Sequence, residues 1–197
     1  MARKSLNTSG FTSSQEQSGG FDPLPGGEYL VNIFDVKDGE YKSAANSGVQ
    51  NINVQFRVAA GRPFANRAVF NLIPMEPTWK NGKDAFSFFQ FWGAVLGTGK
   101  QFRKDFNDKI EKGEDPADLL LENSDLLGKQ VVVKVRPTPR DKAEEAFEKA
   151  VAEGRAKEGQ TVENYIRDEV REIRPATAED VNGAAPSLPS ETASFVL

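Results

Sequence analysis

Residues 51–58 of the chain, with the sequence NINVQFRV, show the most regular hydrophobic pattern in the protein. Apolar and polar side chains alternate strictly through this stretch. An alternation with a period of two is typical of a strand that buries one face and exposes the other. Residues 51–58 therefore predict a strand with an apolar inner face and a polar outer face that ends in Arg57.

Four other segments on either side of residues 51–58 also predict strands. The first of them, residues 28–36 (EYLVNIFDV), is rich in β-branched and aromatic side chains, which strands favour. The other three are residues 67–72, residues 131–135, and residues 164–174, which end at Pro175.

Two segments between the predicted strands show helical spacing. Within residues 84–97 apolar side chains recur at i, i+3, i+4 and i+7, with Asp84 as the predicted N-cap and Gly97 as the predicted stop. We expect this helix to close the open end of a barrel, with only Phe86 off its apolar stripe. Residues 141–154 predict a second amphipathic helix, inserted between the fourth and fifth strands.

The predicted order is three strands, a helix, one strand, an inserted helix and one strand. A mainly β, five-stranded OB-fold barrel has this element order, and other small β-barrels share part of it. We expect residues 21–176 to form this domain, with an insertion at residues 137–163. Residues 1–20 predict a disordered arm and residues 177–197 a disordered tail, because both contain few large apolar side chains. The exception is the end of the tail, Phe195-Val196-Leu197.

The composition argues against an enzyme. The chain contains no His and no Cys, which excludes imidazole bases, thiol nucleophiles and the zinc sites built from these residues. The acidic run Glu111, Glu114, Asp115 and Asp118 lacks the spacing of a calcium loop, so we expect no metal and no cofactor. No apolar run approaches the length of a membrane span, so we also expect no membrane partner.

Several segments, taken in order, resemble phage-encoded single-stranded DNA-binding proteins with an OB fold. The likeness covers residues 27–176, about three quarters of the chain, and rests on Gly27-Glu28-Tyr29, residues 51–58, 67–72, 86–96 and 127–135, and Pro175-Ala176. The chain departs from the family at two places. Asn66-Arg67 stands where relatives usually have Gly-Arg, and residues 137–163 replace a short hairpin.

The resemblance implies a non-enzymatic protein of phage DNA replication or recombination that binds single-stranded DNA in the host cytoplasm with little sequence preference. In an OB fold the strand crosses the second and third strands and the loops that flank them. Lys and Arg side chains neutralise phosphates there, and aromatic rings stack on nucleobases. The expected nucleic-acid-binding residues are Tyr41, Lys42, Asn53, Gln55, Arg57, Arg67, Trp79, Lys80, Lys134 and Arg136.

Each of these assignments has an alternative. The charged and amide side chains also suit ordinary solvated positions, and the rings of Tyr41 and Trp79 also suit packing on the rim of a barrel. For the whole protein, the alternative is a virion structural or adaptor β-barrel that mediates protein–protein contacts.

Two outlying segments carry further expectations about partners. The inserted helix docks either on the barrel or on another copy of the chain, which would make a homo-oligomer, or it clamps a bound strand. Phe195-Val196-Leu197 is similar to the hydrophobic tip by which bacterial single-strand binders recruit replication or recombination proteins. Few acids precede this tip, so a frayed end is the interpretation that we favour.

Overall fold

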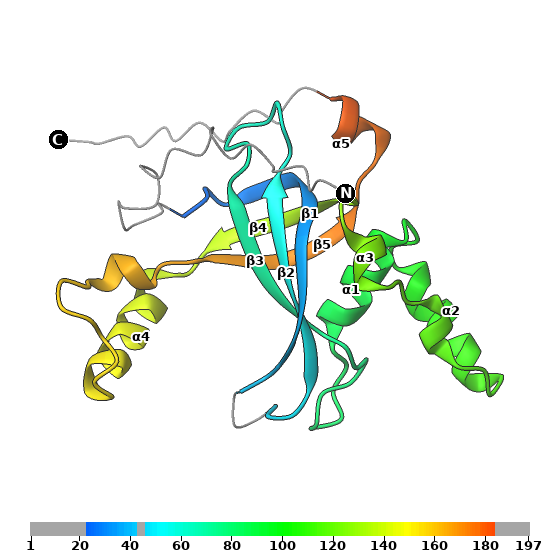
Figure 1. Ribbon diagram of the computed structural model, residues 1–197, viewed down its shortest axis with the longest axis horizontal. Coiled ribbons are helices and arrows are strands. Elements are labelled where there is room, and N and C mark those ends of the chain that lie inside the picture. Colours follow the sequence, from blue (N-terminus) through cyan, green and yellow to red (C-terminus); the bar gives the residue numbers. More distant parts are fainter. Residues whose placement is uncertain (1–22, 43–45, 184–197) are drawn as a thin grey trace, which may run out of the picture. The chain divides into compact units, whose positions relative to one another are not determined.

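The computed structural model describes residues 23–42 and 46–183, which fall into two units (Figure 1). The larger unit contains the described residues of Leu24–Pro137 and Asp168–Leu197, and the smaller one includes Thr138–Arg167. The predicted arm at residues 1–20 and the tip Phe195-Val196-Leu197 lie outside the described residues. Within the ranges described, no helix has the length and apolar character needed to cross a membrane.

The larger unit is built on one antiparallel sheet of five strands in the order β3-β2-β1-β4-β5. Its edge strands β3 and β5 lie close to each other, so the sheet curls into a half-barrel. This mainly β architecture is compatible with an OB-like fold. The strands are β1 (Gly27–Glu40), β2 (Gln50–Val58), β3 (Ala68–Pro74), β4 (Gln130–Pro137) and β5 (Asp168–Pro175).

The alternation is confirmed for residues 52–58, in which Ile52, Val54, Phe56 and Val58 of β2 are all buried. It is wrong at Asn51, which was expected on the outer face and is 3% exposed. The predicted fifth strand is wrong at its start, because residues 162–165 form the 3₁₀ helix η3 (Val162–Tyr165) and β5 begins only at Asp168. The physical reason is a local cap. The Thr161 N–H donates to the side-chain oxygen of Asn164 at 2.8 Å, which favours a turn over an extended chain.

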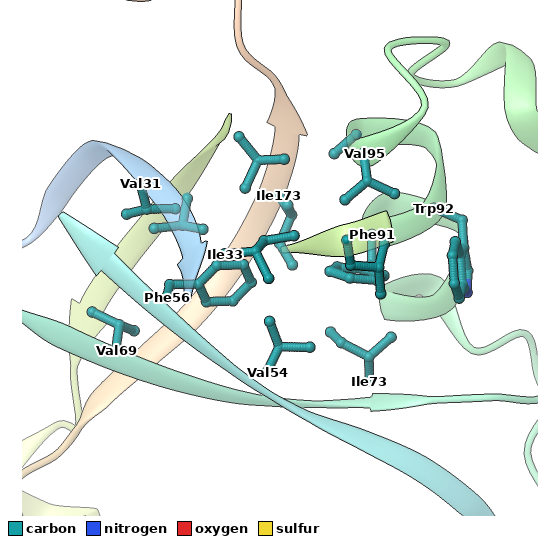
Figure 2. Packing of buried hydrophobic residues seen from close by; sticks show 14 of the residues in the cluster. Val31, Ile33, Val54, Phe56, Val69, Ile73, Phe91, Trp92, Val95 and Ile173 are labelled. Carbon is teal, nitrogen blue, oxygen red and sulfur yellow. The ribbon is translucent and has the colours of Figure 1, made fainter. Parts of the chain in front are cut away.

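Helices α1 (Phe86–Val95) and α2 (Gln101–Glu111) supply most of the aromatic side chains of the core. Helix α1 packs against β3, β4 and β5, and Figure 2 shows Phe91 and Val95 beside sheet residues such as Ile33 and Ile173. The chain turns sharply between the two helices. A side chain at Gly93 would overlap the carbonyl of Gly99, so only glycine allows this approach.

The ends of α1 agree with the sequence only in part. Gly97 follows the helix with a φ of +73°, as expected of a glycine stop. Asp84 does not cap α1, because the N-cap is Ala85 and the Asp84 carboxylate accepts a hydrogen bond from Arg103 of α2. Two short helices, η2 (Pro116–Leu119) and α3 (Asn123–Leu126), complete the connection to β4.

The smaller unit consists mainly of α4 (Arg140–Ala152) and η3. Ala143 and Ala150 of α4 are buried, and the Phe147 ring lies edge-on to Tyr165 with 5.5 Å between the ring centres. The Thr138 N–H donates to the carbonyl of Arg167 at 2.8 Å, where the two ends of the unit meet. This unit extends the insertion beyond the predicted 137–163, because the fifth strand starts later than expected.

Helix α5 (Ala178–Asn182) corrects the expectation of disorder from residue 177 onward. Its start is capped by Thr177 and Asp180, which exchange hydrogen bonds in a capping box. Its end is held by Arg62 of the β2–β3 loop, which donates to the carbonyls of Asp180, Val181 and Gly183. These polar contacts order α5 although it contains no buried residue.

Asp180 also forms an ion pair with Arg174, at 2.7 Å, and this pairing holds the pKa of Asp180 well below its ordinary value. Because an acid with a lowered pKa stabilises the fold when ionised, this contribution is present at neutral pH and is lost as the pH falls below the ordinary Asp range, about 4. We expect Asp180→Asn to lower the free energy of unfolding by about 1 kcal/mol at neutral pH. Urea denaturation of both proteins measures this difference.

The same comparison at about pH 3 should show a smaller difference, because the carboxylate is then mostly protonated in the unfolded chain, which lowers the free energy of unfolding of the wild type. Glu179→Gln is the matched control, because Glu179 lies on the same helix and is exposed. An equal loss of stability at both pH values would contradict an electrostatic role for Asp180.

Candidate functional site

The outward side of β1, β2 and β3 carries side chains in rows that run across the strands. In one row Gln55 of β2 lies between Asp35 of β1 and Phe70 of β3, and in the next row Asn53 lies between Lys37 and Leu72. We call this surface the outer face. It consists of Phe34, Asp35, Lys37, Asn53, Gln55, Arg57, Phe70 and Leu72.

Phe34 is presented on the outer face by a β-bulge. Ile33 pairs with Phe56 and Asp35 pairs with Gln55, so Phe34 is the extra residue between them. Its side chain is 53% exposed, and the guanidinium carbon of Arg57 lies 3.5 Å from the centre of its ring. The Arg57 Nε is buried and has no hydrogen-bond partner among the residues that the structure describes. Arg57 is therefore held by the ring, as in a cation–π pair.

Phe70 and Leu72 place two more apolar side chains on the outer face. They are 57% and 46% exposed, whereas Val69 and Ile73 on the other side of β3 are buried. Phe70 lies directly across from Gln55, which places its ring beside the polar row of β2. The outer face thus combines two exposed aromatic rings with a cation and two amides, and Asp35 is paired with Lys37 at 2.9 Å.

The aromatic residues predicted in the loops come together at one end of β1 and β3. The Tyr41 and Trp79 rings meet edge to face, with 5.4 Å between their centres, and the Tyr41 hydroxyl donates to the carbonyl of Leu72 at 3.0 Å. Both residues are half-buried, and Trp79 packs against the core. Lys80 donates to the carbonyl of Ser47, while Lys42 is exposed. The structure thus brings these four residues to the end of the outer face that Leu72 occupies.

The remaining predicted bases are more widely placed. Arg67 stands directly before β3, and its charge acts on Asp168 at the start of β5. Lys134 and Arg136 lie on β4, on the far side of β1 from β2. There the register sets acids beside them: Glu28 and Glu172 flank Lys134, and Glu169 is opposite Arg136. The structure does not bring these two bases to the outer face.

A groove lies where the edge strands β3 and β5 approach each other. Its volume is about 560 Å³, and it is lined by Asn53, Phe70, Asn71, Leu72, Asp168, Glu169, Val170 and Arg171. The Leu24 N–H donates to Asp168 Oδ1 at 2.6 Å, and burial raises the pKa of the Asp168 carboxyl above its ordinary value. Glu169 is bound by Arg171. One wall of the groove therefore continues the outer face, and the other wall carries charge from β5.

The acidic run rejected as a metal site has structural partners. Lys109 binds Glu114 at 3.1 Å and lies 3.7 Å from Asp118, while Asp115 accepts a hydrogen bond from the Ala117 N–H and caps η2. Within residues 23–42 and 46–183, no group of three or more acidic side chains is arranged to hold a metal ion. The run thus serves helix ends and ion pairs on the surface.

Sequence reasoning found the amides and Arg57 of the outer face but not Phe34, Phe70 or Leu72. The signal for Phe70 and Leu72 was present, because they alternate with Val69 and Ile73. The bulge hid Phe34, since it breaks the alternation of β1 at that point. What the outer face offers chemically is stacking, one ring-held cation and hydrogen bonds from amides.

No protein-family model matches the chain, and no curated protein shows significant similarity to it.

Proposed function

We propose that this protein is a non-enzymatic, single-stranded DNA-binding protein with an OB fold, acting in phage DNA replication or recombination in the host cytoplasm. It binds through the outer face with little sequence preference. Basic side chains on and around this face neutralise phosphates, and nucleobases stack on its aromatic rings.

The observation that carries the proposal is the exposure of Phe34 and Phe70 on one surface. Both rings are more than half exposed and lie among polar side chains. Covering such an exposed ring removes apolar surface from water. A nucleobase that stacks on it contributes about 1–3 kcal/mol to binding. Stacking tolerates any sequence, because every base has a π-face.

The position of these rings supports the same function. In OB folds the second and third strands form the platform for oligonucleotides, with the adjoining loops at its ends. Here the outer face covers β1, β2 and β3, and Tyr41 and Trp79 stand at one end of it. A single strand that crosses this face meets Phe34, Phe70 and then the Tyr41–Trp79 pair.

Arg57 provides a cation at the centre of this path. Its guanidinium lies over the Phe34 ring and forms no ion pair with a carboxylate in the part of the chain that the structure describes. A guanidinium held in place by a ring gives up little side-chain entropy when it binds a phosphate. This is the arrangement expected of a residue that tracks a nucleic-acid backbone.

The second candidate function is that of a virion structural or adaptor protein, and Leu72 is the observation that favours it. An aliphatic side chain cannot stack on a base, yet Leu72 is 46% exposed beside Phe70. An apolar patch with a polar rim is also typical of a protein–protein contact.

Titration with labelled oligo-dT separates the two functions. At about 50 mM salt the protein should bind the oligonucleotide, and the affinity should fall steeply as the salt concentration rises. Duplex of equal length should bind far more weakly. The chain contains two tryptophans, of which Trp92 is fully buried and Trp79 is half-buried. Quenching of tryptophan fluorescence by the oligonucleotide therefore reports DNA at the Tyr41–Trp79 end. Absence of oligo-dT binding at this salt concentration would reject the proposal.

Arg57→Gln locates the binding surface in the same assay. Loss of one phosphate contact should reduce the slope of log affinity against log salt by about 0.7, the contribution of one charge on a single strand. Arg103→Gln is the matched control, because Arg103 also lies over phenylalanine rings, at 5.2 Å from Phe89, but on α2. An unchanged slope for Arg57→Gln would place the phosphate contacts elsewhere.

A further inference from the structure

The groove between β3 and β5 has a composition that backbone binding does not explain. A surface that only tracks phosphates repels them wherever it carries acids. Yet the wall of this groove opposite Phe70 contains Asp168 and Glu169. The two acids differ: Glu169 is bound by Arg171, whereas Asp168 is half-buried and oriented by the Leu24 N–H at 2.6 Å.

A carboxylate within a nucleic-acid surface suits a base edge rather than a phosphate, because it can only accept hydrogen bonds. Asp and Glu accept from the exocyclic amino group of cytosine in direct readout of bases. A carboxylate has acceptor positions for about four hydrogen bonds. In the part of the chain that the structure describes, the Leu24 N–H is the hydrogen-bond donor that orients Asp168, and the Arg67 charge also acts on this carboxylate. Its other acceptor positions can serve a ligand.

The other groove residues complete a site for a planar, polar ring. Phe70 offers an aromatic face on the β3 wall, and the amides of Asn53 and Asn71 offer both donors and acceptors. The volume of about 560 Å³ lies within the range of small-molecule pockets, which is ample for a nucleobase and its sugar. The groove opens beside the outer face, so one base of a strand on that face can turn into it without leaving the surface.

We propose that the β3–β5 groove holds one nucleobase of the bound strand and selects a base with an exocyclic amino group, cytosine among the pyrimidines, through the Asp168 carboxylate. This inference rests on the proposed function and deepens it. Binding across the outer face stays independent of sequence, while a single position in each bound strand is read.

The test compares short oligo-dC and oligo-dU with the wild-type protein. These bases have the same size and carry no methyl group, so they differ in the amino or oxo group at one ring position and in the adjacent nitrogen. We expect oligo-dC to bind about five- to tenfold more tightly than oligo-dU at slightly alkaline pH, the effect of one hydrogen bond to a charged acceptor. Equal affinities for the two would overturn the inference and leave the proposed function intact.

Asp168→Asn should reduce the preference for oligo-dC to about twofold or less and leave oligo-dU binding nearly unchanged. Glu172→Gln is the matched control, because Glu172 lies on the same strand beside Lys134 and does not line the groove. A preference that survives Asp168→Asn would overturn the role of Asp168. If neither oligonucleotide binds at about 50 mM salt, the proposed function itself fails.

Asp168→Asn should also fold as well as the wild type, which keeps the variant informative. Burial raises the pKa of Asp168, so its ionised form is less favourable in the folded chain than in the unfolded one. Asparagine removes that charge and keeps an oxygen for the Leu24 N–H. A thermal melt of the variant at neutral pH, matching or exceeding that of the wild type, verifies this. The wild-type comparison of oligo-dC with oligo-dU needs no variant.

Discussion

Replacing Phe34 and Phe70 together by alanine is expected to weaken oligo-dT binding by about 30- to 20,000-fold. Each stacked base contributes about 1–3 kcal/mol, so two lost rings give about 2–6 kcal/mol at 1.4 kcal/mol per tenfold. Loss of Phe34 also removes the ring that holds Arg57, with its guanidinium 3.5 Å from the ring centre. The change should appear in the equilibrium affinity measured by fluorescence anisotropy of a labelled oligonucleotide at constant salt.

Phe86→Ala provides the matched control for this experiment. Phe86 is 64% exposed, as large as the other two, and lies at the start of α1 away from the outer face. It should change affinity less than about twofold, a difference well under 1 kcal/mol. If the double variant binds as tightly as Phe86→Ala, the outer face is not the binding surface.

Phe88→Ala is expected to remove about 3–5 kcal/mol from the free energy of unfolding, the usual loss when a buried phenylalanine is truncated. Phe88 is 1% exposed and meets four other rings, at 5.2 Å for Phe89 and 5.4 Å for Phe106. Its ring joins α1 to α2, so the cavity cannot close without moving one helix. A domain with ordinary marginal stability would lose a large share of it.

Urea denaturation of Phe88→Ala and Phe86→Ala measures this directly. The two residues lie on the same helix and undergo the same substitution, so helix propensity cancels in the comparison. Phe86→Ala should cost less than about 1 kcal/mol because its ring is already mostly in water. Similar losses in the two variants would mean that the aromatic cluster contributes little to stability.

Local patterns predicted the strands well where one face is buried and the other is not. Residues 51–58 are the clearest case, because strict alternation leaves only one way to place them. The fifth strand was misplaced because Thr161 and Asn164 form a capping box, whose hydrogen bonds outweigh β propensity over a few residues. Helix α5 was missed for a similar reason. Its order depends on Arg62, which comes from a distant part of the chain.

The site was harder to predict than the fold. The alternation correctly predicted that Asn53, Gln55 and Arg57 face outward, and it predicted the same for Lys134. It could not show that Lys134 is separated from β2 by β1, since that depends on strand order and not on strand pattern. The groove also escaped prediction, because it forms between β3 and β5, which are far apart in the sequence.

The bulge at Phe34 places an exposed ring outside the regular pairing of β1 with β2. Ile33 and Asp35 pair with the adjacent residues Phe56 and Gln55, so removing Phe34 would leave a regular ladder with every other side chain on its present face. Pairing of β1 with β4 ends at Asn32, and Ile33, directly before the bulge, also exchanges backbone hydrogen bonds with Gly128 and Lys129. The pairing of β1 with β2 thus does not require Phe34, and deleting its single codon would remove one exposed ring and the ring partner of Arg57.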